Sequence, residues 1–547
     1  MDTDVLIVGA GPVGLSLAAC LCRHGMPFRI VEQKPGPVTT SNAIAVHSRT
    51  LELFCLLGLA GELIEQGVWA EALELNGGGR VLAHINFTEL DSAYPGLLAI
   101  PQYRTERILN RHLLNEGVTI ERTLKLVSFT QDQASVQATL EHNDGSLEAV
   151  QAAWLVGCDG ANSSVRQILE QPFETVLENQ QFVLADLRIS WPLPSNQFTA
   201  FFHQEGAVYI APLPEERHRV VIDLTNAGPL VRNLIDFEQL RLIFSRRVPL
   251  AAQLSDPSWI ALYETNVGHV SSYRSGRVFV AGAAAHVHRP AGSSGFNAGL
   301  QDAFNLAWKL ALAAKTRSPA RILDSYSSER LRVAKALFAL YEGVMQAAAE
   351  RKPAMQHFRN LTLPLLSGWD AVPDSGLIDK PEMGLNYRTS GAVLQEGQFS
   401  PAAPQAGDRA PLPIFSGRNL LHCLDPAAHT LLLFTANDDT PESLSLLSAI
   451  RRDAEAAYSG LIRGYVVTRS PAASPLLASE PLASAKDLLI DAGGEIHVAY
   501  AATKPCLYLI RPDAYIAYRV EPPDGAALHR FLRKAYGLTP LHQRASQ

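Results

Sequence analysis

The sequence predicts an α/β protein of several domains, and three observations support this prediction. The apolar run Val5 to Val8 leads into closely spaced glycines and then an amphipathic helix. Segments beginning at Trp154 and Val278 repeat the order of apolar strand, glycine turn and helix. The chain has 547 residues, and domains usually hold about 100 to 200. Strands that alternate with helices are typical of parallel sheets, so we expect a Rossmann-like domain at the start of the chain.

The overall composition is that of a soluble globular protein, with 47% hydrophobic and 18% charged residues and a net charge of −7. The sequence has no clustered basic segment of the kind that would indicate a nucleic-acid partner, so we expect none. The six cysteines are scattered, without C-x-x-C pairs or zinc-ligand spacing. We therefore expect reduced thiols, no metal site and a cytoplasmic protein.

The apolar stretch from Val5 to Cys22 resembles a signal peptide or a membrane span in length and hydropathy. Asp2 and Asp4 precede it, where a signal peptide carries positive charge, and glycines and Pro12 interrupt it. These features favour a segment of a folded domain and predict no membrane association.

The first glycine turn has the spacing G-x-G-x-x-G. Its first glycine makes the turn, its second lets the backbone approach a pyrophosphate, and its third allows close packing of helix on strand. A second strand-like run, FRIVE, ends in an acid that can accept a ribose hydroxyl. A glycine-bearing turn of another doubly wound fold is the alternative. The order of strand, glycines, helix, strand and acid predicts a dinucleotide site formed by Gly9, Gly11, Val13, Gly14 and Glu32.

Two later segments have the same local pattern. AAWLVGCDGANSSVRQIL, from Ala152, places a polar turn between a strand and a helix, and a capped turn without any ligand is its alternative reading. GRVFVAGAAAHVHRPAGSSGFNAGLQDAFNLAWKLA, from Gly276, joins a strand to a long helix through small residues. The free N–H groups at the start of that helix would favour negative charge.

Together the three segments resemble the single-component FAD-dependent aromatic hydroxylases, in the branch of phenol, 3-(3-hydroxyphenyl)propionate and polyketide hydroxylases. Further stretches resemble the family in the same order: SRTLELFCLLGL from Ser48, PQYRTERIL from Pro101, ILDSYSSERLRVA from Ile322 and LNYRTS from Leu385. The resemblance covers most of residues 1 to 395.

The resemblance implies a domain plan. A discontinuous FAD-binding domain would comprise residues 1–75, 101–174 and 271–345, and residues 76–100 and 175–270 would form a β-sheet domain over the substrate. Residues 346–398 would form a helical connection. After a Pro- and Ala-rich stretch, residues 399–547 resemble the thioredoxin-like C-terminal domain of this branch. CLYLIRPDAYIAYR within it predicts a hairpin around Pro512 to Ala514. Cys423 and Cys506 stand alone, so a structural or dimer-contact role is expected there.

The resemblance also implies roles for single residues. The backbone of Gly295, Phe296 and Asn297 would face the N1/O2 edge of the isoalloxazine and stabilise the charge of reduced flavin. The other implied positions are Glu32 at the adenosine ribose, Arg49 near the pyrophosphate, Gln102 on the flavin side, Asp159 near FAD and the nicotinamide nucleotide, and Pro290 packed beside the flavin. For Arg49 an ordinary place on a helix surface is the alternative.

One position departs from the family. Its third motif reads Gly-Asp, with the acid on a ribityl hydroxyl, whereas this chain has Gly282-Ala283. Losing one charge-assisted hydrogen bond costs about 1.5–3 kcal/mol, roughly tenfold to a hundredfold in affinity. FAD binding should therefore survive but weaken. Asp302 is too far along the following helix to be assumed a substitute.

The implied chemistry needs few protein side chains, because the cofactor carries it. NADPH or NADH would reduce FAD as a transient partner, O2 would add to give a flavin C4a-hydroperoxide, and one oxygen atom would pass to a small aromatic, phenolic substrate. Water must be excluded for this to succeed. His286 and His288 are expected to pack in a polar loop.

The stretch QFTAFFHQEGAVYIAPLP, from Gln197, alternates as half-buried strands do. It would place Phe198 and Phe202 on one face and Phe201 and His203 on the other. Phe201, His203 and Tyr209 are the substrate-site candidates, with ordinary sheet packing as their alternative role.

Two other functions remain open. Baeyer–Villiger oxidation uses the same scaffold, and Ala283 permits a binding or scaffold protein that has lost its flavin. A flavin-dependent halogenase should carry W-x-W-x-I-P, which GWDAV near Trp369 does not match.

Overall fold

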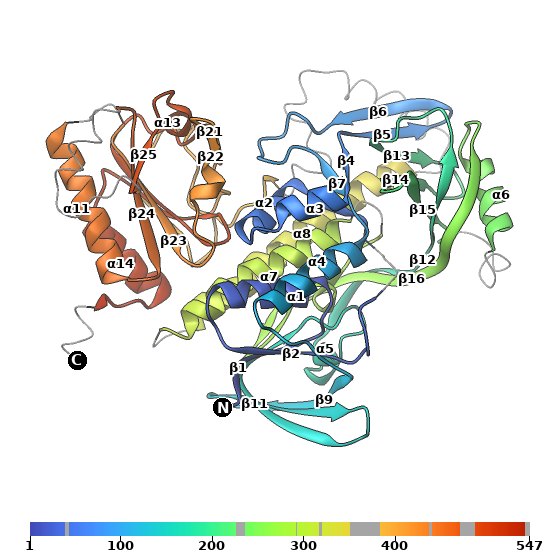
Figure 1. The fold of residues 1–547 in the computed structure, drawn as a ribbon, viewed down its shortest axis with the longest axis horizontal. Helices are drawn as coiled ribbons and strands as arrows, with labels where there is room; N and C mark the ends of the chain where they lie inside the picture. Colours follow the sequence, from blue (N-terminus) through green and yellow to red (C-terminus); the bar gives the residue numbers. More distant parts are fainter. Residues whose placement is uncertain are drawn as a thin grey trace.

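The computed structural model describes residues 1–38, 43–225, 236–290, 293–316, 320–349, 383–436, 440–470 and 487–541. Figure 1 shows the N-terminal sheet and its helices in the centre, a second large sheet on one side and the C-terminal domain on the other. Most of the predicted connection 346–398 lies outside the described residues.

The first sheet contains the three predicted glycine-turn strands as neighbours. Its order is β17-β18-β11-β1-β2-β8, with β9 and β10 extending it beside β11. The parallel strands are β1 (Thr3–Val8), β2 (Phe28–Glu32), β8 (Glu121–Arg122), β11 (Leu147–Gly157) and β18 (Val278–Val280). The antiparallel strands are β9 (Leu124–Gln131), β10 (Val136–His142) and β17 (Arg274–Ser275). Continuous apolar runs suit strands that are buried on both faces.

Three helices position the site against this sheet. They are α1 (Pro12–Arg23), α4 (Gln102–Asn115) and the almost wholly buried α7 (Ser294–Ala313). Figure 1 shows α1, α4 and α7 together above β1 and β2, with α8 (Ala320–Ala349) beside α7. Shorter elements complete this part: α2 (Ser48–Leu56), α3 (Ala60–Gln66), α5 (Ser164–Ile168), and a small sheet of β3 (Ala45–His47), β4 (Val68–Ala70) and β7 (Leu97–Ala99).

The second sheet has the order β19-β16-β12-β15-β14-β13-β5-β6. Its strands are β5 (Ala72–Gly77), β6 (Arg80–Asn86), β12 (Phe173–Ser190), β13 (Gln197–Phe202), β14 (Val208–Leu213), β15 (Arg217–Asp223), β16 (Gln253–Val270) and β19 (His286–Val287). Strand β19 leads directly out of the third glycine turn, so it connects this sheet to the first one.

The two faces of the second sheet meet different neighbours. On one face Phe201 and Val208 pack with Leu240 and Phe244 of α6 (Phe237–Arg247). On the other, Tyr209 and Tyr263 pack around Phe182. The alternation predicted for Phe198, Ala200 and Phe202 against Phe201 is confirmed, because the first three pack on a core that lacks Phe201.

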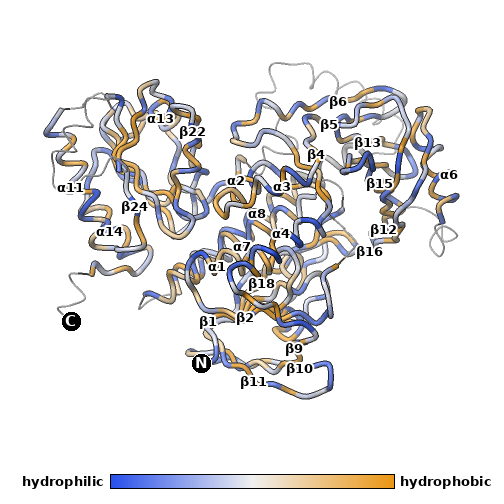
Figure 2. The backbone as a smooth tube through the Cα atoms, viewed as in Figure 1, coloured by the Kyte–Doolittle hydropathy of each residue, from blue (hydrophilic) through white to orange (hydrophobic). Residues whose placement is uncertain are grey.

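The C-terminal domain has a six-stranded sheet in the order β20-β27-β26-β23-β24-β25. These strands are β20 (Leu394–Gly397), β23 (His429–Phe434), β24 (Ile462–Thr468), β25 (Leu488–Ile490), β26 (Cys506–Ile510) and β27 (Ile516–Glu521). Helices α11 (Pro441–Ala457), α13 (Glu495–Ala499) and α14 (Gly525–Tyr536) accompany them, with the short strands β21 (Ile414–Phe415) and β22 (Arg418–Asn419). Figure 2 shows apolar residues concentrated along the strands of this domain. The hairpin predicted between β26 and β27 is confirmed, and the architecture is compatible with the thioredoxin-like expectation.

Within the described part of the chain, no helix is long and apolar enough to cross a bilayer.

Candidate functional site

A cavity of about 530 Å³ opens where the three glycine turns meet. The carboxyl ends of β1, β11 and β18 lie side by side, because Val8 pairs with Gly157 and Gly157 pairs with Val280. Ligands of open α/β sheets bind at this edge. The cavity is lined by the first turn, the end of β2, α4, the segment after β11, and the third motif up to the start of α7.

The first turn needs glycine for two physical reasons. Gly9 has φ +103°, and a Cβ there would lie 2.5 Å from the carbonyl oxygen of Cys158. A Cβ on Gly14 would collide with the carbonyl oxygen of Gly9. Gly11 differs, because a Cβ there would meet nothing within 4 Å. Gly11 caps α1 without any side-chain hydrogen bond, so its side of the turn is open to the cavity.

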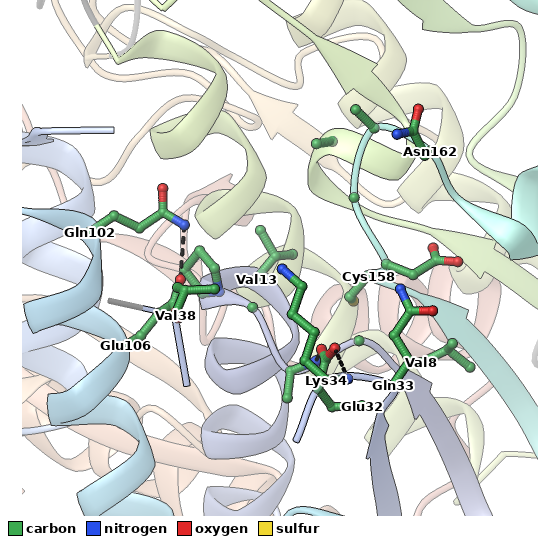
Figure 3. Close-up of a pocket in the computed structure, with 18 of the residues that line it drawn as sticks. Val8, Val13, Glu32, Gln33, Lys34, Val38, Gln102, Glu106, Cys158 and Asn162 are labelled. Atoms are coloured by element: carbon green, nitrogen blue, oxygen red, sulfur yellow. Dashed lines mark hydrogen bonds between the residues drawn. The ribbon is translucent and has the colours of Figure 1, made fainter. Parts of the chain in front are cut away.

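The Glu32 carboxylate is held by two backbone groups. It accepts hydrogen bonds from Ala10 N–H at 2.9 Å and from Lys34 N–H at 2.9 Å. The residue lines the cavity directly beside the first turn, as Figure 3 shows. Its position therefore suits the expected contact with a ribose.

Asp159 lines the cavity from the end of β11. One carboxylate oxygen accepts a hydrogen bond from Val165 N–H at 3.2 Å, at the start of α5, while the other is buried without a partner among the described residues. Burial raises the pKa of this carboxyl above its ordinary value, although hydrogen bonds from Ser163 and the Val165 N–H oppose the shift. Asp159 thus bonds a backbone N–H in the first turn of α5 and also lines the cavity.

Gln102 reaches the cavity from the first turn of α4. Its amide oxygen accepts a hydrogen bond from Ala43 N–H at 3.3 Å, and its amide nitrogen donates to Glu106 at 2.8 Å. Burial raises the pKa of Glu106 to about 7, against the effect of the Gln102 hydrogen bond. Figure 3 shows Gln102 and Glu106 together on α4, across the cavity from Asn162. Sequence reasoning missed Glu106, which its i,i+4 spacing from Gln102 would have indicated.

The third motif ends at the N-terminus of α7. Ser293 occupies the N-cap position of this helix, with φ 55°, but its side chain does not bond the N–H groups of the first turn. Its hydroxyl instead accepts hydrogen bonds from the N–H groups of Ile44 and Ala45. Gly295 and Phe296 line the cavity. Asn297 is fully buried and its side chain bonds His47 N–H and Ala45 C=O, so it holds β3 against the helix.

The departure at Ala283 lies in the wall of the cavity. Ala283 is exposed and lines it, in the short turn 282–284 that follows β18. Asp302 does reach this turn, contrary to its apparent remoteness in the sequence, and accepts a hydrogen bond from Gly282 N–H at 2.9 Å. Its side chain is fully buried behind the turn, so it holds the turn's backbone and does not line the cavity.

Both histidines of the third motif line the cavity and are packed. His288 stacks on Phe338 with a centroid distance of 4.1 Å, and His286 lies 3.1 Å from Asp302 through Nε2. Burial lowers the pKa of His288 well below its ordinary value. Pro290 also lines the cavity, beside Arg289.

Arg49 lies away from the cavity, contrary to the expected pyrophosphate contact. Its guanidinium is fully buried, pairs with Glu52 at 3.0 Å and donates to the carbonyl oxygen of Asp513. It also lies 4.9 Å from the ring centroid of Tyr515. The C-terminal domain covers this face of α2, so Arg49 contacts another domain and is absent from the cavity wall.

None of the three substrate candidates lines the described cavity. Phe201 is on the face that α6 covers, and His203 lies in the turn after β13, where it accepts from Glu205 N–H. Tyr209 is on the same sheet face as Tyr263, and Tyr263 does line the cavity. Tyr263 belongs to the alternating run of β16 and sequence reasoning missed it.

The residues present fit FAD. Two helix N-termini without side-chain caps face one cavity, as the pyrophosphate and the flavin edge of a dinucleotide require. The carboxylate of Glu32 lies beside the first of them. Among the described residues, no cluster of three metal-ligating side chains is present.

Comparison with known proteins agrees with this geometry. Residues 2–340 match the family model described as FAD binding domain. Pentachlorophenol 4-monooxygenase of Sphingobium chlorophenolicum is 30% identical over 95% of this chain and 94% of its own. The 6-methylpretetramide 4-monooxygenase of Streptomyces rimosus is 36% identical over 63% of this chain and 64% of that protein. The solved anhydrotetracycline hydroxylase of Streptomyces rimosus superposes with a TM-score of 0.73 at 27% identity, covering 98% of this chain and all of that one. The chain therefore belongs to the FAD-binding-domain family of flavoprotein aromatic monooxygenases.

Proposed function

We propose that this enzyme uses NADPH or NADH and O2 to hydroxylate a phenolic substrate held between FAD and the second sheet. The observation that carries the proposal is the extent of the cavity. It runs from the first glycine turn to the N-terminus of α7 and to Tyr263 on the second sheet. A dinucleotide can occupy the first part and an aromatic ring can pack at the second.

In this proposal the chain's backbone does most of the binding. The N–H groups around Gly11 to Val13 would receive the pyrophosphate, and Glu32 would accept from the adenosine ribose. Gly295 and Phe296 would direct N–H groups at the flavin, where the dipole of α7 stabilises negative charge. Gln102, Asp159 and Pro290, which line the same cavity, would complete the contacts.

Bound FAD would supply the electron transfer and the activation of O2. The chain would orient the ring and exclude water. The face of the second sheet around Tyr263 carries Phe182, Leu184 and Val221, which are apolar and buried. A substrate ring on this face would be shielded from solvent, which limits wasteful loss of activated oxygen.

The substrate class follows from the chemistry and from the relatives. Transfer of an electrophilic oxygen requires an electron-rich ring, which a phenolate provides. The relatives are named for pentachlorophenol, 6-methylpretetramide and anhydrotetracycline. We therefore propose a substituted phenol or a phenolic polycycle.

The test starts from the purified chain with FAD. NADPH and NADH oxidation would be followed with pentachlorophenol, simple phenols and anhydrotetracycline, and the products would be analysed by mass spectrometry with isotope-labelled O2. We expect substrate-stimulated oxidation and a product containing one labelled oxygen atom.

Two other outcomes would contradict the proposal. Stimulated oxidation that yields only hydrogen peroxide would identify an oxidase. A labelled product in which oxygen has entered the ring skeleton, shown by NMR, would identify Baeyer–Villiger chemistry.

A further inference from the structure

The turn 282–284 is fixed from behind by a single carboxylate. Asp302 accepts from Gly282 N–H at 2.9 Å and from Arg330 Nε at 2.6 Å, and it lies 3.1 Å from His286. Burial would raise the pKa of Asp302, but the Arg330 guanidinium first, and then His286, hold it below the ordinary value. The Asp302 carboxylate is thus charged and buried, and it binds the turn on the side away from the cavity.

The turn has little freedom apart from this bond. Gly282 has φ +60°, and a Cβ there would lie 2.7 Å from Val13. A Cβ on Gly299 of α7 would lie 2.9 Å from the Cα of Gly282. The turn is therefore clamped between α1 and α7, and Asp302 sets the direction in which its backbone faces the cavity.

Arg330 connects Asp302 to a residue beyond α8. Its Nη2 donates to the carbonyl oxygen of Ala298 at 2.9 Å, and its Nη1 donates to the hydroxyl of Tyr387 at 2.8 Å. All of these side chains are buried. A guanidinium held at three points transmits a displacement of any one partner to the others.

Tyr387 is itself held by the C-terminal domain. Its N–H donates to the carbonyl oxygen of Gly407 at 2.7 Å. Its ring packs on Tyr515 with a centroid distance of 4.3 Å, and the guanidinium of Arg511 lies 5.0 Å from its centroid. Tyr387, which the C-terminal domain contacts, is therefore connected to Asp302 through two hydrogen bonds. One joins its hydroxyl to Arg330, and the other joins Arg330 to Asp302.

We propose that Tyr387, Arg330 and Asp302 are positioning residues through which the docked C-terminal domain sets the affinity for FAD. They act through the backbone of the 282–284 turn, in a chain that has no acid at position 283 to hold the cofactor directly. The proposal rests on FAD binding and is independent of the substrate.

The test is Tyr387→Phe, which removes one hydroxyl. Arg330 and Asp302 lie between this hydroxyl and the turn at the cavity wall. FAD would be removed from the full-length protein and titrated back, with flavin fluorescence as the readout. We expect the Kd for FAD to rise about threefold to tenfold, the worth of one hydrogen bond. The visible absorption bands of the bound flavin should shift as well, because the turn's dipoles move relative to the ring.

Two controls separate this from general loosening. Tyr515→Phe removes a hydroxyl from the neighbouring ring, and that hydroxyl has no hydrogen-bond partner among the described residues. Arg409→Lys perturbs a different buried contact between the domains, the pair with Glu52. Both should leave the Kd for FAD within twofold of the parent, even where Arg409→Lys lowers the thermal midpoint.

A second variant covers the case in which Tyr387→Phe lowers stability. Arg330→Lys keeps the charge beside Asp302 but cannot reach all three partners at once. We expect it to weaken FAD binding at least as much as Tyr387→Phe. An unchanged Kd in both variants would overturn the proposal, and so would an equal rise in the Arg409→Lys control.

Discussion

Arg511 and Glu329 form a two-pronged ion pair with both side chains fully buried, at 2.9 and 3.0 Å. Arg511 lies in the turn after β26 of the C-terminal domain, and Glu329 lies on α8, so the pair joins these two elements. Lys309 of α7 also contacts Glu329, at 2.7 Å. Burial alone would raise the pKa of Glu329, but Arg511 and then Lys309 hold it well below the ordinary value. At this contact between the domains, the buried charge of Glu329 is paired with the charges of Arg511 and Lys309.

Glu329→Gln should strongly destabilise the protein, because it leaves two buried cations without their shared partner. We expect a loss of about 3–5 kcal/mol in the free energy of unfolding, measured by urea denaturation. Because the pKa of Glu329 is lowered on folding, this contribution exists above the unfolded carboxyl pKa and is lost as pH falls below it. The matched control is Glu238→Gln in the exposed pair with Arg241, which should cost less than about 1 kcal/mol. Similar losses for both would contradict the assignment.

Glu106 should make FAD binding depend on pH. Its pKa of about 7 means that the cavity gains a negative charge near neutral pH. FAD carries a negative pyrophosphate, so its Kd should rise above pH 7, by at most about tenfold per pH unit. The same raised pKa predicts that the contribution of Glu106 to stability without FAD is fully present below the unfolded carboxyl pKa and is lost as pH rises through 7.

The measurement is an FAD titration of the flavin-free protein at several pH values. Glu106→Gln should flatten the profile, whereas Glu62→Gln on α3, outside the cavity, should keep it. A profile that persists in Glu106→Gln would assign the titration to another group.

The local patterns predicted most of what positions the site. Glycine spacing and apolar runs identified β1, β11 and β18, and parallel pairing brings their carboxyl ends together without further information. The face alternation of β13 was also predictable, because the side-chain period of a strand is two.

The positions that sequence reasoning did not anticipate depend on contacts made by distant segments. Arg49 could not be placed, because the carbonyl that it binds belongs to Asp513 in another domain. Phe201 faces α6, and alternation alone does not tell which face a later helix will cover. Asp302 reaches the turn because Gly282 packs beside Gly299, part-way along α7, and helical side chains lean toward the N-terminus.

Two glycines of the first turn should respond differently to alanine. Gly14→Ala places a Cβ against the carbonyl oxygen of Gly9, so the protein without FAD should lose thermal stability. Gly11→Ala meets no protein atom within 4 Å, so the protein should fold normally. It should lose FAD affinity, because the methyl group would enter the space that we propose for the pyrophosphate. Thermal unfolding without FAD and an FAD titration together check both. Destabilisation by Gly11→Ala without FAD would contradict the open face assigned to it.

Ala283→Asp should strengthen FAD binding. The side chain at 283 is exposed in the cavity wall, so a carboxylate there has room and a path to the cofactor. A charge-assisted hydrogen bond to a hydroxyl contributes about 1.5–3 kcal/mol, which corresponds to roughly a tenfold to hundredfold fall in Kd. Ala283→Asn is the matched control, since it has the same shape without the charge and should gain less. Retention of flavin through gel filtration would give an independent readout. An unchanged or weaker affinity in Ala283→Asp would mean that the turn held by Asp302 directs this side chain away from any hydroxyl of FAD.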